Sequence, residues 1–196
     1  MAAPNLGCFP RKTSRGEILP MNYHPLAPLA PPGTSEFPEQ MNRWIALALF
    51  LLASFSAAAI GGYATFDPVR TWYPSLVKPA WNPPAALFGP VWTLLYTAMS
   101  FAAWRIWLRR ELAGARPALW LFCASLGLNA LWSVLFFGCR QPGWALLEVL
   151  LLWVCLVMLQ FRFARLDPVA GWLWAPYLAW VSFATALNAA IWRLNA

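Results

Sequence analysis

Tryptophan is the residue type with the most evident chemistry in this chain, because fourteen occur among 196 residues. An indole ring offers a flat apolar face for stacking and a single N–H donor. Trp44, Trp107 and Trp144 lie at the ends of apolar runs, as is ordinary at the headgroup level of membrane proteins. Six other tryptophans lie away from the run ends: Trp92, Trp132, Trp153 and Trp180 inside the runs, and Trp72 and Trp81 in a long connection. Their N–H groups and ring faces need partners, which either helix packing or a planar aromatic ligand can supply.

Polar residues recur at helical spacing beside these tryptophans. Ser125, Asn129 and Ser133 follow one another every four residues and therefore share one face of a helix. Trp132 adjoins that face. An asparagine in mid-membrane normally points into the bundle, so a packing bond between helices and contact with a ligand are both open for Asn129. A second four-residue repeat consists of Trp180, Ala184, Asn188 and Trp192.

Glu148 is the one acidic residue inside an apolar run. A charged group near the centre of a membrane helix costs ~2.5–3.5 kcal/mol to insert. It lies about 9 Å from the start of its helix, at ~1.5 Å per residue. Arg70, Lys78 and Arg140 belong to the same side of the membrane. A structural ion pair and a role toward a ligand or a proton are equally open.

Composition excludes several other kinds of site. His24 is the only histidine, which leaves no basis for a histidine metal site or a catalytic triad. The net charge of +7 does not indicate nucleic-acid binding, because the basic residues lie at the ends of apolar runs. We expect no metal, no required cofactor and no nucleic-acid partner. No CxxC pair occurs among the four cysteines Cys8, Cys123, Cys139 and Cys155.

Five apolar runs must position these residues, in a chain that is 61% hydrophobic and 11% charged. Each run approaches or exceeds the ~20 residues that a helix needs to cross the hydrocarbon core, and no alternating strand pattern occurs. The sequence predicts an all-α integral membrane protein, a bundle of five transmembrane helices with a long first loop. The predicted helices span about 43–64, 84–107, 117–139, 142–163 and 168–192.

Prolines and an acid mark where these helices begin. Pro117, Pro142 and Pro168 fit the first position of a helix, where a missing N–H costs nothing, and Asp167 fits the N-cap of the last helix. The loop over 65–83 is the only long connection, and loops of that length are usually functional.

Residues 1–40 form a separate, proline-rich segment without an apolar period, which we interpret as a disordered tail before the transmembrane domain of 41–196. In the five-helix topology, ten basic residues belong to the amino-terminal side and four to the other, so the amino terminus is predicted to be cytoplasmic in a plasma membrane. The ten are Arg11, Lys12, Arg15, Arg43, Arg105, Arg109, Arg110, Arg116, Arg162 and Arg165, and the four are Arg70, Lys78, Arg140 and Arg193.

Small residues form two ridges on the first predicted helix, which permit close approach either inside the bundle or across a homodimer. The ridges are Ala53, Ala57 and Gly61, with Ser54, Ala58 and Gly62 beside them.

Four segments in order resemble the translocator protein family, also called tryptophan-rich sensory proteins or peripheral-type benzodiazepine receptors. They are WYPSLVKPAWNPP at 72–84, FGPVW at 88–92, LNALWS at 128–133 and PYLAW at 176–180. The resemblance runs from about Met41 to Asn195.

The resemblance implies a five-helix bundle, often dimeric, whose pocket opens toward the first loop. Members bind porphyrins such as protoporphyrin IX, and isoquinoline carboxamides. Glu148 matches a position where some members carry an acid. Tyr177 is followed by no basic residue until Arg193, which departs from the cholesterol motif of vertebrate members and argues against a sterol as the main ligand. By position, Tyr73, Trp92, Asn129, Trp132, Trp180 and Ala184 line the pocket, and Trp72, Trp81 and Asn188 support its lid and base.

Three functions follow as hypotheses. The first is a porphyrin sensor or carrier, in which the first loop is a lid and Arg70 and Lys78 orient an anionic ligand. The second is an enzyme that degrades porphyrin in light through Trp92 and Trp180. The third is a structural membrane subunit with a vestigial pocket.

Overall fold

The computed structural model describes residues 36–196, with side chains from residue 42 onward. The interpretation of residues 1–40 as a disordered tail therefore lies outside the described residues, except at the end of that segment. There the first helix begins at Glu36, roughly two turns before the predicted start.

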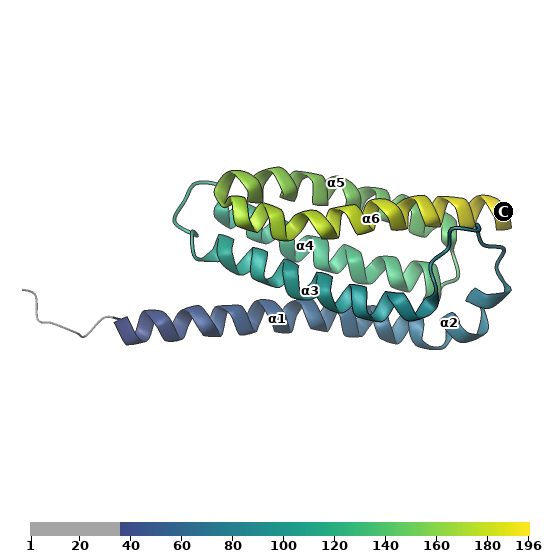
Figure 1. Ribbon diagram of the computed structural model, residues 1–196, viewed down its shortest axis with the longest axis horizontal. Helices are drawn as coiled ribbons and strands as arrows, with labels where there is room; N and C mark the ends of the chain where they lie inside the picture. The colour runs from purple at the N-terminus through teal and green to yellow at the C-terminus, as the bar shows by residue number, and fades with distance from the viewer. Residues whose placement is uncertain (1–35) are drawn as a thin grey trace, which may run out of the picture. The chain divides into compact units, whose positions relative to one another are not determined.

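The described residues are almost entirely helical, and no strand occurs among them. Figure 1 shows the long helices α1, α3, α4, α5 and α6, with the short helix α2 in the first connection. A 3-10 turn follows α2, and α4 continues into a π-helical turn. The bounds are α1 Glu36–Phe66, α2 Pro68–Thr71, the 3-10 turn Tyr73–Ser75, α3 Ala85–Trp107, α4 Ala115–Ser133, the π turn Val134–Gly138, α5 Pro142–Leu166 and α6 Pro168–Asn195.

Helices α3, α4, α5 and α6 pack against one another in a ring, and α3 also contacts α5 across it. Their connections are short, so successive helices run antiparallel (Figure 1). The core is formed by large side chains that are fully buried between them, among them Met99, Phe122, Leu156 and Trp174. Apolar contact of this kind holds the four helices in fixed register and leaves the cavity described below at one end.

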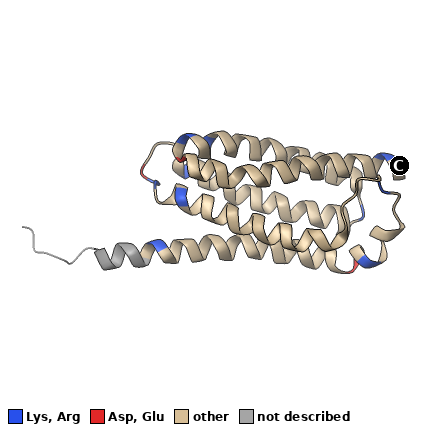
Figure 2. Ribbon diagram, viewed as in Figure 1, with Lys and Arg blue, Asp and Glu red and all other residues tan. Residues whose placement is uncertain are grey.

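Four of the long helices have the length and composition of membrane spans. They are α1 from Asn42, α3, α4 together with its π turn, and α5. Figure 2 shows that the charged residues gather at the two ends of the described helices, while their middle is almost free of charge. This distribution is what a hydrocarbon layer around the helices requires. The fifth long helix, α6, is not among the four that meet both criteria.

The junction between α5 and α6 is held by Asp167, as predicted for the N-cap of α6. Its side chain accepts hydrogen bonds from the amides of Val169 at 2.9 Å and Ala170 at 3.4 Å. Arg105 and Arg109 of α3 pair with the same carboxylate at 2.8 and 3.1 Å. One buried carboxylate therefore joins α3 to the start of α6.

Helix α4 begins at Ala115, two residues before the predicted opening at Pro117. Gly114 precedes it with a φ of 89°, a left-handed conformation that glycine adopts at little cost. Pro117 is still tolerated, because amides of the first helical turn have no intrahelical partner to lose.

Three of the small residues of α1, Ser54, Ala57 and Gly61, are buried against the other helices. Ser54 is fully buried and bonds to Ser100 of α3 at 2.8 Å. Gly61 lies so close to α4 that a Cβ atom on it would come within 2.9 Å of Ser133 Oγ. Of the two possibilities left open by the sequence, close approach within the bundle is the one that Ser54, Ala57 and Gly61 serve.

Candidate ligand pocket

A cavity of about 380 Å³ lies between the helices at the end that carries the first connection. Small-molecule sites typically have volumes of ~300–1,000 Å³. Residues of α1, α3, α4 with its π turn, and α6 form most of the wall. The first connection contributes Val69 and Tyr73, and α5 contributes none. Most of the wall is apolar, and much of it is aromatic. The aromatic lining residues are Phe55, Tyr73, Phe88, Trp92, Tyr96, Trp132, Phe136, Phe137, Trp180 and Phe183.

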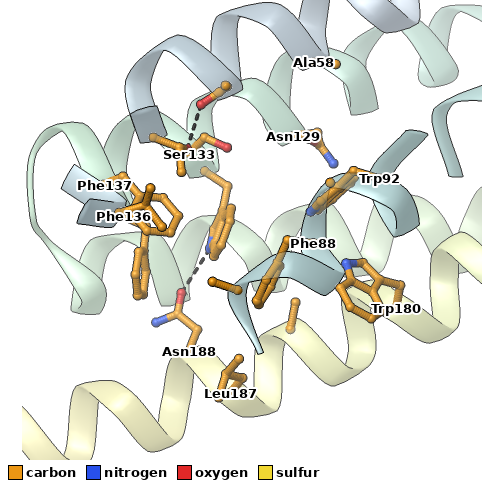
Figure 3. Close-up of a pocket in the computed structure, with 18 of the residues that line it drawn as sticks. Ala58, Phe88, Trp92, Asn129, Ser133, Phe136, Phe137, Trp180, Leu187 and Asn188 are labelled. Carbon is orange, nitrogen blue, oxygen red and sulfur yellow. Dashed lines mark hydrogen bonds between the residues drawn. The ribbon is translucent and has the colours of Figure 1, made fainter. Parts of the chain in front are cut away.

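All six residues that the family resemblance assigns to a pocket wall line this one cavity, and Asn188 joins them. Helical spacing explains why they meet. Phe88, Trp92 and Tyr96 are four residues apart on α3, so their side chains share one face. Trp180 and Ala184 have the same spacing on α6. Figure 3 shows Trp92, Phe88 and Trp180 on one side of the cavity, opposite Phe136 and Phe137.

Asn129 connects three helices at the inner end of the cavity. Its Oδ1 accepts a hydrogen bond from the hydroxyl of Tyr96 at 2.8 Å, and its Nδ2 donates to the hydroxyl of Tyr177 at 2.6 Å. All three side chains are buried. Asn129 thus makes the packing bonds that its mid-membrane position allows, and it lines the cavity as well.

Trp132 is fixed by a second polar link. Its indole Nε1 donates to Oδ1 of Asn188 at 3.0 Å, drawn as a dashed line to Asn188 in Figure 3. Asn188 Nδ2 in turn donates to the carbonyl oxygen of Pro142 at 2.8 Å, which ties in the start of α5. The ring of Trp132 also stacks on Phe136 with a centroid separation of 5.2 Å.

Trp92 and Trp180 differ from Trp132 in one respect. Neither indole N–H donates a hydrogen bond within the described part of the chain, whereas their rings contact other aromatic rings. The ring centroid of Trp92 lies 5.4 Å from that of Tyr96, and the ring centroid of Trp180 lies 5.9 Å from that of Phe88. The cavity therefore contains two indoles with a polar group available to a ligand.

The first connection, residues 67–84, lies at the mouth of the cavity and is named here the α1–α3 connection. Tyr73 is its lining aromatic residue, and its hydroxyl donates to Oδ1 of Asn82 at 2.7 Å. Trp72 and Trp81 do not line the cavity but contact residues that do. Trp72 packs against Phe136 with a ring-centroid separation of 5.8 Å, and Trp81 packs against Phe183 with one of 5.7 Å.

Arg70 and Lys78 belong to the α1–α3 connection, the predicted lid. Neither lines the cavity. The ammonium of Lys78 donates to three carbonyl oxygens of its own connection, those of Tyr73 at 2.9 Å, Pro74 at 3.2 Å and Leu76 at 2.7 Å. The guanidinium of Arg70 lies over the ring of Phe66, 4.3 Å from its centroid. These contacts stabilise the connection, and the Lys78 ammonium also lies 5.1 Å from the ring centroid of Tyr73.

Glu148 is buried on α5 and does not line the cavity. Neither carboxyl oxygen has a hydrogen-bond partner among the described residues. The structural ion pair that the sequence left open is therefore not formed, because no arginine or lysine of the described part of the chain pairs with it.

Several lining residues carry no signal in the sequence. Phe88 could have been found from its four-residue spacing to Trp92, but Phe136, Phe137 and Phe183 resemble any apolar residue of a membrane run. Gly61 and Gly62 of α1 line the cavity although they have no side chain. No side-chain chemistry reveals such a contribution.

The fold and the pocket define a class of protein. It is an all-helical membrane protein whose aromatic pocket lies under the α1–α3 connection. Residues 47–193 match the TspO/MBR family, and the chain belongs to that family. It is therefore a multi-pass membrane protein, and the family resemblance of the sequence is confirmed.

Individual relatives cover most of the chain. The translocator protein of Homo sapiens is 37% identical over 156 residues, which cover 78% of this chain and 91% of the relative. The tryptophan-rich protein TspO of Chlorobaculum tepidum is 39% identical over 160 residues, with coverage of 79% and 99%. The tryptophan-rich sensory protein of Cereibacter sphaeroides is 41% identical over 155 residues, with coverage of 79% and 95%.

Proposed function

We propose that this protein is a membrane-embedded receptor for a planar tetrapyrrole such as protoporphyrin IX, acting as a sensor or a carrier. The observation that carries the proposal is the pair Trp92 and Trp180. Both rings line one apolar cavity, and neither N–H is used by the described residues. A large aromatic ligand would stack on such faces, and aromatic pairs contribute ~0.5–1.5 kcal/mol beyond burial.

The names of the relatives support this class of function. Those reported above include a translocator protein and a tryptophan-rich sensory protein. Transport and sensing both require a pocket that binds its ligand reversibly. A wall of aromatic rings without charged side chains suits reversible binding of an aromatic ligand. The side chains that line the cavity include no aspartate, glutamate, lysine or arginine.

The topology proposed for this function has five spans, with α6 as the fifth. Residues 169–192 of α6 contain no charged residue, and Trp174, Tyr177 and Val181 are buried against the other helices. Tryptophan, tyrosine, asparagine and proline lower the hydropathy of α6 while remaining suited to a helix packed inside a bundle.

Five spans place the two ends of the described helices on opposite sides of the membrane. The end that holds the start of α1 also carries Arg43, Arg105, Arg109, Arg110, Arg116, Arg162 and Arg165. We therefore assign that end to the cytoplasm and the mouth of the pocket to the other side.

Titration of protoporphyrin IX fluorescence tests the pocket. We expect Trp92→Ala and Trp180→Ala each to weaken binding about tenfold, and replacement by phenylalanine to cost less, because a phenyl ring still stacks. Trp153→Ala is the matched control, since its N–H bonds to Ser182 and its ring does not line the cavity. Unchanged affinity in both alanine variants would remove the assignment and favour a structural subunit.

A second candidate function is light-dependent degradation of porphyrin. It is favoured by the contact of Trp92 with Tyr96 at 5.4 Å, because neighbouring indole and phenol rings can share an oxidised state. Illumination of the purified protein with excess protoporphyrin IX separates the two functions. Many turnovers to a defined product would identify an enzyme, whereas stoichiometric quenching identifies a receptor.

A further inference from the structure

Asn195, at the end of α6, bonds to the backbone of Val77 in the α1–α3 connection. Its Oδ1 accepts from the amide of Val77 at 2.9 Å, and its Nδ2 donates to the carbonyl oxygen of Val77 at 2.9 Å. The Nδ2 group also donates to the carbonyl oxygen of Ile191 at 2.7 Å. One side chain thus pairs with both backbone groups of Val77, while its own helix holds it in the required orientation.

This pairing is the directional link between the connection and the helices around the pocket. Within the described part of the chain, the other hydrogen bonds of residues 67–83 remain inside the connection or its own flanks. The remaining contacts across the mouth are apolar packing. Trp72, Tyr73 and Leu76 pack against the cluster around Phe136, and Trp81 packs against Phe183. Ring contacts permit sliding, whereas a two-point backbone pairing fixes position.

The connection is built to move as one piece. Lys78 joins three of its carbonyl oxygens, and Tyr73 bonds to Asn82 across it. Internal bonds of this kind survive when the outer link to Asn195 breaks. Because Tyr73 lines the cavity, a displacement of the connection also moves part of the pocket wall.

We propose that Asn195 is a latch that holds the α1–α3 connection closed over the pocket and sets the rate of ligand exchange. The part that concerns ligand rests on the proposed function. Val77 and Asn195 are both exposed to solvent, so water competes for their bonds and the latch opens readily. Asn195 is a positioning residue that acts through the connection and does not itself line the cavity.

Opening can be measured without any ligand. Spin labels at Ala80→Cys and Arg193→Cys, in the full chain with its four natural cysteines replaced, report the distance between the connection and α6. We expect Asn195→Ala to add a population at longer distance, and Asn195→Asp to do the same because it cannot donate to the Val77 carbonyl. Leu194→Ala is the matched control, since Leu194 is exposed on the same turn and makes no hydrogen bond to the connection. Unchanged distances in both Asn195 variants overturn the latch.

Exchange kinetics complete the test. With protoporphyrin IX in stopped flow, we expect Asn195→Ala to raise the association and dissociation rates together by about tenfold and to change Kd by less than about threefold, as the loss of two exposed hydrogen bonds suggests. Longer distances with unchanged rates would overturn control of exchange. Longer distances in a protein that binds no porphyrin would support the latch and refute only the proposed function.

Discussion

Trp132 donates its indole N–H to Oδ1 of Asn188 at 3.0 Å, and this bond divides the tryptophans of the pocket into two kinds. The N–H of Trp132 has its partner within the protein, so this ring is a fixed part of the pocket wall. Trp92 and Trp180 have no such partner among the described residues and present free donors. A sequence that is rich in tryptophan therefore contains both structural rings and rings that are available for binding.

The bonds of Asn188 lead to the first prediction. Asn188→Leu keeps a side chain of similar size but leaves the Trp132 N–H and the Pro142 carbonyl without their partner. A buried group left unsatisfied costs ~1–3 kcal/mol. We expect thermal unfolding in detergent to show a clear loss of stability for this variant, whereas Trp92→Phe should unfold close to the wild type. Equal stability of Asn188→Leu and wild type would show that water replaces both bonds.

Lys78 leads to a second prediction, which differs from the sequence-based expectation that it orients an anionic ligand. Its ammonium is bonded to three carbonyl oxygens of the connection. Lys78→Met keeps the length of the side chain but removes these bonds. We expect similar losses of affinity for protoporphyrin IX and for an uncharged isoquinoline carboxamide, with the salt dependence of porphyrin binding unchanged. A selective loss for the porphyrin at low salt would restore the electrostatic interpretation.

Asn129, Lys78 and Gly61 show which parts of the structure the sequence could and could not predict. The sequence predicted that Asn129 faces the bundle interior, because an asparagine in mid-membrane normally points into the bundle. Lys78 was predicted to lie in the first loop and lies there, but its partners are backbone carbonyls, which leave no trace in a sequence. Gly61 belongs to the wall through the closeness of two helices, a property of packing that no single residue type encodes.

Glu148 leads to a third prediction. Both of its carboxyl oxygens are buried without a partner among the described residues, and burial of an unbonded polar group is unfavourable. Glu148→Gln keeps the shape and removes the acid. We expect its unfolding temperature to equal or exceed that of the wild type, while Glu148→Ala unfolds earlier because it leaves a cavity. A lower unfolding temperature for Glu148→Gln would indicate that a bound water, ion or proton at this position stabilises the fold.

Gly61 and Gly62 of α1 form a matched pair for a fourth prediction, because both line the cavity. A Cβ atom at residue 61 would meet Ser133 Oγ at 2.9 Å, whereas one at residue 62 would meet nothing within 4 Å. Replacing glycine by alanine in a helix gains ~1 kcal/mol from helix propensity. We expect Gly62→Ala to raise the free energy of unfolding by about this amount. For Gly61→Ala, we expect the close contact with Ser133 of α4 to cancel the gain. Thermal unfolding of both variants decides it, and equal gains would mean that α1 shifts freely.

The carboxylate of Asp167, at the junction of α5 and α6, leads to a prediction of pH dependence. Burial raises the pKa of Asp167, but the hydrogen bonds from Arg105 and from the amides of Ala170 and Val169 outweigh it, so the pKa lies below its ordinary value of 3.8. A carboxyl group whose pKa is lower in the folded state stabilises the fold above its ordinary pKa, and this stabilisation is lost as the pH falls through the folded value.

Asp167→Asn should therefore reduce the free energy of unfolding by ~2 kcal/mol at neutral pH, the scale of hydrogen bonds to charged groups. We expect the same difference from wild type at pH 7 and pH 5, because Asp167 is ionised at both. Below about pH 4 the difference should shrink, since the carboxyl group of the unfolded wild-type chain takes up a proton first and the folded one follows at lower pH. Thermal unfolding of both proteins in one detergent at each pH measures it. A difference that already shrinks between pH 7 and pH 5 would mean that Arg105 and Arg109 do not hold the carboxylate in its charged form.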